Sequence, residues 1–167
     1  NSKKDYSNFK LILGDATNLT IEDKTIDTLY SYASLYHIQK IDLVLDEIYR
    51  ILKKEGVAIL EFSTKPHINA FVSEYHAKNS GWGIPYFKSY SEILALIERN
   101  NFDIIEEHHF QLLPTLRGPW WSLPLANSFL KPLLKIKIKD KAIDEHISSF
   151  SLFKKFAFKH ILIIKKL

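Results

Sequence analysis

Short apolar runs and amphipathic segments alternate along this sequence, and this alternation restricts the fold more than any other feature. Apolar side chains at helical spacing predict a helix from Ile41 to Leu52, and a second helix is predicted over Tyr90–Arg99 with Asn101 as its left-handed cap. Strands that alternate with helices indicate an α/β protein with a mostly parallel sheet. Five apolar runs are typical of its strands: Phe9–Leu13, Ile26–Ser31, Val57–Phe62, Phe102–Ile105 and Phe156–Ile164.

Two details of the first helix follow from the same pattern. Asp46 and Arg50 lie four residues apart and are expected to pair across one turn. Gly56 is expected to stop the helix, because glycine takes a left-handed turn without strain.

Length and composition fit one globular domain. The chain has 167 residues, of which 46% are hydrophobic, and this is enough for a sizeable core. Cysteine is absent, which excludes disulfides and thiolate zinc sites and favours a cytoplasmic location. Two aromatic and proline-containing stretches, 65–88 and 113–153, interrupt the alternation and are expected to be cap or substrate-side insertions. Their aromatic residues could form an apolar lid over a small molecule: Trp82, Tyr86, Trp120 and Trp121.

The net charge of +4 is concentrated near the carboxyl terminus, where ten lysines lie between residues 131 and 167. Such a tail can attract anionic ligands or an anionic membrane, which would make peripheral membrane contact. The alternative is an ordinary solvated lysine-rich surface. Because no aromatic stripe is interleaved with the lysines, a nucleic-acid partner is not expected.

Small or polar residues follow three of the predicted strands, at Gly14-Asp15-Ala16, Ser31-Tyr32 and Ser63-Thr64. Ligands of open parallel sheets bind beyond the carboxyl ends of the strands, so these three turns are expected to open into one crevice. A carboxylate at Asp15 could accept a hydrogen bond from a ligand amine. It could equally cap its own turn, as Asp after Gly often does.

The stretch LILGDATNLTIEDKTIDTLYSYASLYHI, followed by LDEIYRILKKEGVAILEF, resembles class I, Rossmann-like S-adenosylmethionine (SAM)-dependent methyltransferases, in particular the small-molecule enzymes of the ubiquinone-biosynthesis type. The order and spacing follow that family's "GDA…LPF.D..FD.V.S...L.H" and "L.E..RVLKPGG" patterns. The matching positions are Gly14, Asp15, Ala16, Leu19, Asp23, Ile26, Asp27, Ser31, Leu35 and His37, then Leu45, Glu47, Arg50, Leu52, Lys53 and Gly56.

The resemblance implies a role for each matched residue near the cofactor. Asp15 would accept the adenine amino group, and the backbone N–H of Ala16 would serve a ring nitrogen. Ser31 and Tyr32 would line the floor under the methionyl part, and His37 would close over the cofactor or face the substrate. The resemblance also implies helices on both faces of the sheet and an antiparallel last strand.

The same resemblance implies that part of the family pattern precedes Asn1. The family's first strand, its GxGxG loop and its ribose-binding acid have no counterpart in this sequence, so the chain is expected to be the carboxyl-terminal two-thirds of a methyltransferase domain. Two departures, Lys54-Glu55-Gly56 for Pro-Gly-Gly and Thr20 for proline, fall outside the implied ligand contacts.

Methyl transfer from a sulfonium requires that the acceptor be held about 3 Å from the methyl group in a dry site. If the acceptor must lose a proton, His37 is the first candidate base and His67 the second; each could instead be a polar or capping histidine. The pair His108-His109 suggests a metal, but neighbouring strand residues point to opposite faces, so no metal site is expected.

Two other functions remain open at this stage. A non-catalytic, methyltransferase-like binding or scaffold protein would keep the sheet without turnover. A dinucleotide-binding oxidoreductase would share the architecture, because a fold does not fix a function. No residues of a dehydrogenase site are recognisable in the sequence, so we expect a SAM-dependent methyltransferase acting on a small molecule that is apolar or anionic.

Overall fold

The structure is a computed structural model, and it describes residues 10–81, 83–113, 132 and 136–167. Within this part of the chain, no helix is long and apolar enough to cross a membrane. The expected insertion 65–88 contains a helix and a short strand, whereas much of 113–153, with Trp120 and Trp121, lies outside the described residues, as does Trp82.

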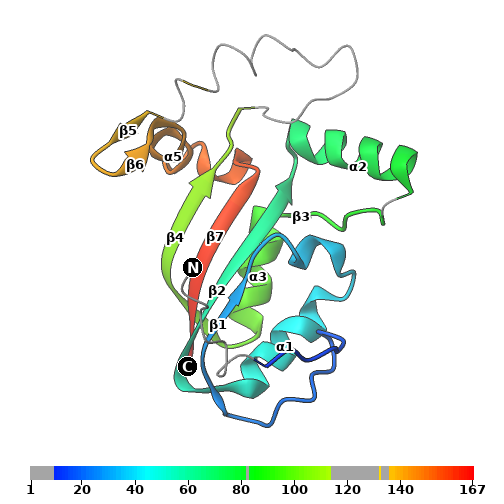
Figure 1. Ribbon diagram of the computed structural model, residues 1–167. Coiled ribbons are helices and arrows are strands. Elements are labelled where there is room, and N and C mark those ends of the chain that lie inside the picture. The colour runs from blue at the N-terminus through cyan, green and yellow to red at the C-terminus, as the bar shows by residue number, and fades with distance from the viewer. Residues whose placement is uncertain (1–9, 82, 114–131, 133–135) are drawn as a thin grey trace, which may run out of the picture.

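The main sheet has the strand order β1-β2-β7-β4, with β3 paired to the end of β2 (Figure 1). β1 (Ile26–Ser31), β2 (Leu52–Lys65) and β3 (Lys88–Ser89) run parallel. β7 (Lys159–Lys166) lies antiparallel between β2 and β4 (Phe102–Phe110). The mostly parallel sheet and the antiparallel last strand are therefore confirmed.

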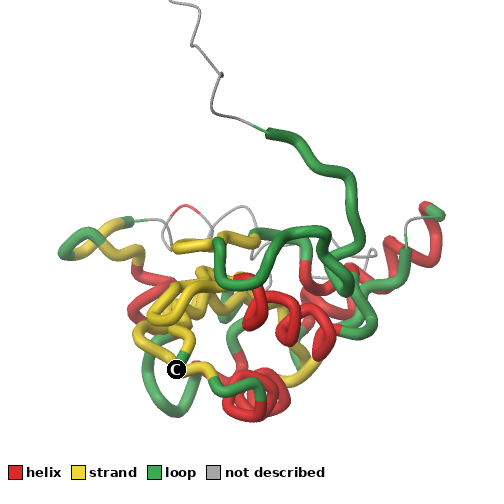
Figure 2. The backbone as a smooth tube through the Cα atoms, turned by 90° about the horizontal axis from the view of Figure 1, so that it is seen from below, coloured by secondary structure: helices red, strands yellow, loops and turns green. Residues whose placement is uncertain are grey.

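Two amphipathic helices pack on one face of this sheet, α1 (Ile41–Ile51) and α3 (Tyr90–Arg99) (Figure 2). α2 (Ile68–Ser80) follows β2 beyond its carboxyl end (Figure 1). α5 (Ile143–Ser148) contacts β4 through His108, whose side chain points away from α3, so helices contact both faces. The remaining elements are short: η1 (Leu35–His37), η3 (Lys154–Phe156), β5 (Lys137–Ile138) and β6 (Lys141–Ala142).

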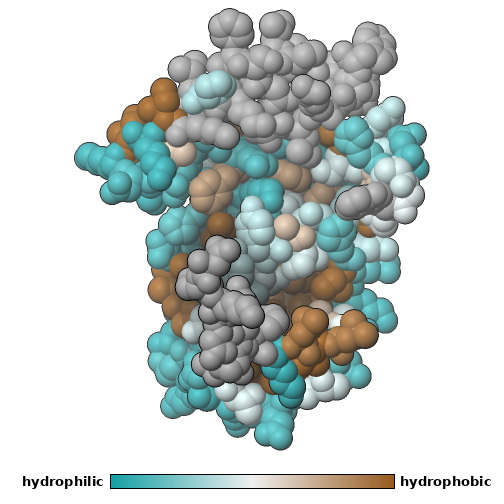
Figure 3. Space-filling view, viewed as in Figure 1, coloured by the Kyte–Doolittle hydropathy of each residue, from teal (hydrophilic) through white to brown (hydrophobic). Residues whose placement is uncertain are grey.

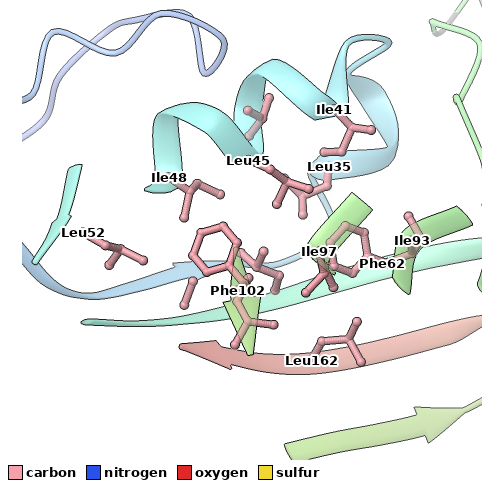
Figure 4. Packing of buried hydrophobic residues seen from close by; sticks show 14 of the residues in the cluster. Leu35, Ile41, Leu45, Ile48, Leu52, Phe62, Ile93, Ile97, Phe102 and Leu162 are labelled. Atoms are coloured by element: carbon pink, nitrogen blue, oxygen red, sulfur yellow. The ribbon is translucent and has the colours of Figure 1, made fainter. Parts of the chain in front are cut away.

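The core lies between the sheet and the helices α1 and α3, as Figure 4 shows. Alternate residues of the central strands, such as Leu60 and Leu162, are completely buried there against Leu45 of α1 and Ile97 of α3. This alternation follows from the period-2 geometry of a strand, since one face of the sheet meets the helices. Tyr90–Arg99 forms a helix as predicted, and Asn101 takes the left-handed conformation with φ 58°.

The strand predicted over Phe9–Leu13 is wrong for its described residues 10–13, which form no strand. Leu11 is 86% exposed and Leu13 100% exposed, and this segment extends away from the body of the molecule in Figure 2. A strand needs a neighbour to satisfy its backbone N–H and C=O groups. An apolar run of residues does not by itself provide a neighbouring strand.

The predicted end of the first helix is also wrong. α1 ends at Ile51 because Leu52 already pairs with Ile26 of β1. Gly56 lies inside β2, and the left-handed residue beside it is Glu55, with φ 65°. Steric crowding explains why residue 56 is a glycine, since an added Cβ would lie 2.8 Å from the carbonyl oxygen of Lys53.

Arg50 does not pair with Asp46 as predicted. Its guanidinium group binds Glu47 at 2.8 Å and Asp23 at 2.5 Å, and donates to the carbonyl oxygens of Leu19 and Ile21. Hydrogen bonds to Glu47 and Asp23 raise the pKa of Arg50 further above its usual range. This fork-shaped donor therefore fastens the segment before β1 onto α1.

Candidate functional site

β1 ends beside the carboxyl-terminal half of β2: Ser31 pairs with Leu60, and β2 continues from there to Lys65. The chain leaves β1 through a tight turn in which the Ser31 and Ser34 hydroxyl groups are hydrogen-bonded at 2.7 Å. Ala33 has a left-handed φ of 54° in this turn, a conformation that costs free energy for a residue with a side chain. The turn after β1 therefore lies beside β2, whereas the turn predicted at Ser63-Thr64 is wrong, because both residues are paired inside β2.

Glu61 is the residue that holds this turn, and the sequence analysis did not single it out. Its side chain is buried, with the residue 2% exposed. One oxygen accepts the backbone N–H of Ala33 at 3.1 Å, and the other accepts Lys159 at 2.7 Å and the Ser63 hydroxyl at 3.3 Å. An acid inside the apolar run VAILEF was the available signal, since a buried carboxylate needs partners.

Two exposed tyrosines extend this edge on the face of the sheet away from α1. The rings of Tyr30 and Tyr32 are stacked, with centroids 6.4 Å apart and planes at 6°. The Lys159 ammonium group lies 5.1 Å from the centre of the Tyr32 ring. Tyr32 therefore offers a flat aromatic surface beside a cation, at the place where the resemblance predicts a cofactor floor.

Asp15 caps its own turn. Its Oδ1 accepts both the backbone N–H and the hydroxyl of Thr17, each at 2.8 Å. The backbone hydrogen bond from Thr17, followed by the hydroxyl, lowers the pKa of Asp15, which keeps the exposed carboxylate charged. Its Oδ2 has no hydrogen-bond partner among the described residues, so the capping role leaves one oxygen for a ligand.

The Asp15 turn lies beside α1 rather than at the strand ends. The adjacent Ala16 packs against the main core cluster, and the Leu19 N–H donates to Glu47 of α1 at 2.7 Å. Figure 1 shows this dark-blue segment next to α1. The described structure thus places the turn after β1 beside β2, while the segment that follows the first predicted turn contacts α1.

The two histidines predicted as candidate bases have different surroundings. His37 is exposed on η1, directly after β1, and its ring lies 4.2 Å from that of Tyr36. His67 is buried, its Nδ1 accepts the Asn69 N–H at 3.0 Å to cap α2, and its Nε2 lies 3.0 Å from the Leu112 carbonyl oxygen. Burial lowers the pKa of His67. These contacts favour the capping role for His67.

Thr64, which lies in β2 and not in the predicted turn, belongs to a buried polar cluster. His160 Nε2 lies 2.9 Å from the Thr64 hydroxyl and 3.1 Å from the Ala157 carbonyl oxygen, and its Nδ1 lies 2.8 Å from Nδ1 of His109. Because a carbonyl oxygen only accepts, His160 carries its proton on Nε2 and accepts from His109. Burial and the neighbouring His109 lower the pKa of His160 to about 3.

Tyr90 connects this cluster to the first turn of α3. Its ring stacks on His160 at 4.5 Å, and its hydroxyl donates to Glu107, which also pairs with Lys154 at 2.6 Å. Burial, then the hydrogen bond to Glu107, raise the pKa of Tyr90. His109 Nε2 is buried and lies 3.6 Å from Glu107, too far for a hydrogen bond.

The neighbouring histidines 108 and 109 do point to opposite faces, His108 toward Glu145 of α5 and His109 toward His160. Among the described residues, no group of three His, Cys, Asp or Glu side chains could hold a metal ion.

A shallow groove opens near Tyr90, between the end of β2, the first turn of α3 and η3. Pro66, Leu94 and Phe156 provide apolar wall, and Lys65 and Lys155 also line it. A second, small pocket lies under η1 and is lined by Tyr36, Phe62 and Tyr86, among others. The backbone N–H of Tyr86 donates to the Tyr36 carbonyl oxygen at 2.7 Å, so of the four predicted lid residues Tyr86 is the one described near the strand ends.

Comparison with known proteins identifies the architecture. Residues 1–60 match the family model described as a methyltransferase domain. A SAM-dependent methyltransferase from Thermotoga maritima superposes with a TM-score of 0.60 at 16% identity, covering 92% of this chain and 62% of that one. A putative methyltransferase from Bacillus halodurans gives 0.59 at 16%, covering 96% and 78%. The fold is that of a SAM-dependent methyltransferase.

The same fold also occurs in the cyclase SpnF, with a TM-score of 0.52 at 16% identity over 92% of this chain and 54% of that one. Two curated relatives are squalene methyltransferase 1 of Botryococcus braunii, 26% identical over 70% of this chain, and 24-methylenesterol C-methyltransferase 2 of rice, 25% identical over 70%. The chain spans about a third of their length, 32% and 33%. The finer resemblance to the ubiquinone-biosynthesis type is not confirmed, because these relatives are named for squalene and sterols.

Proposed function

We propose that this chain is part of a SAM-dependent methyltransferase that transfers a methyl group to a small, apolar acceptor in the cytoplasm. The proposal depends chiefly on one observation: the carboxyl end of β1, beside β2, presents an open polar and aromatic turn in a methyltransferase fold. The names of the curated relatives support an apolar acceptor.

The described residues fit part of a SAM site. SAM would supply an activated methyl group on a sulfonium. Asp15 has an exposed, charged carboxylate with one free oxygen for the adenine amino group, and Ala16 follows it. Ser31 ends β1, Tyr32 follows it in the turn that Glu61 holds, and both would line the methionyl side. These residues would bind and orient SAM, and such positioning is the main requirement of an in-line displacement.

The acceptor would be held at the same edge of the sheet. The groove beside Tyr90 begins where β2 and β3 end, at Lys65 and Ser89, and much of its wall is apolar. Ligand sites of this kind combine apolar walls with a few placed polar groups. We propose this groove as the place where the apolar body of the acceptor binds.

Asp15→Ala is expected to weaken binding of S-adenosylhomocysteine at least about tenfold, because a charged hydrogen bond to the adenine amine is lost. Isothermal titration calorimetry on the full-length protein measures this. Asp27→Ala is the matched control, since Asp27 is an exposed acid that pairs with Lys53 at the start of β1. Unchanged affinity in the Asp15 variant would remove Asp15 from the adenine site.

His37→Gln is expected to lower turnover at least about tenfold if the acceptor loses a proton, because the exposed imidazole follows β1 directly. The rate should be measured from about pH 6 to pH 9, with His76→Gln on α2 as the matched control. A variant with undiminished turnover at every pH ends the candidacy of His37 as a base.

His67→Gln is expected mainly to destabilise α2, because both ring nitrogens of His67 are engaged.

A second candidate is a protein that binds SAM without methyl transfer. The occurrence of this fold in a cyclase favours this second candidate, because the fold alone does not require methyl transfer. Affinity for S-adenosylhomocysteine together with no methylation of any sterol, squalene or phenolic acceptor would support this alternative.

A further inference from the structure

Helix α5 buries two polar residues and exposes an apolar one. Glu145 and Ser148 are buried, whereas Ile147 is exposed. Asp144 accepts the N–H groups of Gln111 and Leu112 at the end of β4. A surface helix of a globular protein normally shows the reverse arrangement. The two acids of α5 therefore contact β4 and the residues that follow it, and Ile147 faces solvent.

The apolar surface continues through the residues that follow α5. Phe150 is 63% exposed and Leu152 is 66% exposed, and Phe153 and Phe156 are also exposed. The turn that carries them is fixed by hydrogen bonds from the N–H groups of Phe153 and Lys154 to the Phe150 carbonyl oxygen, at 2.8 and 2.9 Å. We call residues 147–156 the apolar segment.

The β5–β6 hairpin extends this surface. The N–H of Ile143 donates to the Ile136 carbonyl oxygen at 3.0 Å, and His146 Nε2 lies 2.8 Å from the Ile138 carbonyl oxygen, so the hairpin is attached to α5. Both Ile136 and Ile138 are exposed. Figure 3 shows hydrophobic atoms beside hydrophilic ones over β5, β6 and α5 at the upper left.

Lysines surround these apolar side chains, and they differ from the lysines of β7. Lys159 pairs with Glu61, Lys165 with Glu55, and Lys166 donates to the backbone, so the β7 lysines serve the sheet. The lysines around the apolar segment that are exposed to solvent are Lys137, Lys139, Lys141 and Lys155, of which Lys141 also pairs with Glu145 at 3.4 Å. Of the nearby acids, Asp144 and Glu145 face inward, and Asp140 is exposed.

We propose that the apolar segment and the β5–β6 hairpin dock the protein on the surface of an anionic lipid bilayer. Exposed Phe, Leu and Ile side chains would enter the boundary between head groups and acyl chains, while the lysines around them would contact anionic head groups. Charge complementarity selects this partner over an uncharged apolar surface. The groove lined by Lys155 and Phe156 lies beside the apolar segment.

The test is flotation of the full-length protein with phosphatidylcholine vesicles, with and without phosphatidylglycerol. We expect binding that requires phosphatidylglycerol and weakens with added salt. The double variant Phe150→Ser/Leu152→Ser should lower the partition coefficient at least about tenfold, and Lys155→Gln should lower it about fivefold. The matched control is Leu43→Ser/Phe71→Ser, which removes two exposed apolar residues from α1 and α2 and should bind as the wild type does.

Three outcomes would overturn the proposal. The first is wild-type protein that does not float with anionic vesicles, and the second is equal binding of the Phe150→Ser/Leu152→Ser variant. The third is a concentration-dependent dimer in light scattering that this variant abolishes while vesicles recruit nothing, which would assign the surface to a second copy of the chain. Calorimetry on the same samples measures their affinity for S-adenosylhomocysteine. A loss of vesicle binding can then be distinguished from a failure of the proposed cofactor site.

Discussion

Lys159→Met is expected to lower the free energy of unfolding by about 3–5 kcal/mol, because it leaves the buried Glu61 carboxylate without its cation. The Glu61 side chain is 1% exposed and Lys159 is 22% exposed, so solvent screens this pair poorly. The remaining donors to Glu61, Ala33 and Ser63, supply hydrogen bonds but no charge. Urea unfolding followed by circular dichroism measures the change.

Lys165→Met provides the matched control on the same strand and the same face of the sheet. Lys165 pairs with Glu55 at the surface, where an ion pair contributes up to about 1 kcal/mol. A second variant, Glu61→Leu with Lys159→Met, should recover much of the lost stability, because it removes the buried charge as well. If the two single lysine variants are equally stable, Lys159 does not balance a buried charge.

Acidification from about pH 7.5 to pH 5 is expected to cost about 2 kcal/mol of stability through His160 alone. Its folded-state pKa of about 3 lies below the ordinary histidine value of 6.5, so the unfolded chain binds a proton that the folded protein excludes. The stability is therefore complete above pH 6.5 and falls as the pH decreases from 6.5 toward 3. Burial also lowers the pKa of His67 and His109, and both act in the same direction.

The contribution of His160 is isolated by comparing the pH dependence of two proteins. His160→Gln should be less stable than wild type at pH 7.5, because its contacts with His109 and Thr64 are disturbed. It should nevertheless lose about 2 kcal/mol less between pH 7.5 and pH 5. Urea midpoints at each pH measure both quantities, and parallel curves for the two proteins would contradict the assignment.

Local signals predicted several elements of the fold correctly. Tyr90–Arg99 is a helix because its apolar spacing, the Ser89 cap with Glu92, and Asn101 all agree. The strands that begin at Ile26 and Phe102 were likewise predicted from their apolar runs. Where local preference and tertiary pairing agree, a short sequence pattern is sufficient.

Other predictions failed where a distant partner decided the structure. Leu52 leaves the helix because Ile26 pairs with it, although the helical pattern includes Leu52. Arg50 binds Asp23, which lies 27 residues away, rather than Asp46 on its own helix. No local rule can weigh such partners, because their distance in space is fixed only when the chain is folded.

The sequence by itself determined the alternation of strands and helices, the helix α3, and the candidate residues Ser31, Tyr32 and Asp15, since each depends on residue type and short spacing. Only the tertiary structure revealed that Glu61 of β2 binds the turn after β1 and the first residue of β7, and that His160 is held without charge. Burial and pairing decide both, because the same carboxylate or imidazole in water would need no partner. The exposure of the apolar side chains that follow α5 was also decided by the tertiary structure, since exposure is a property of the folded molecule.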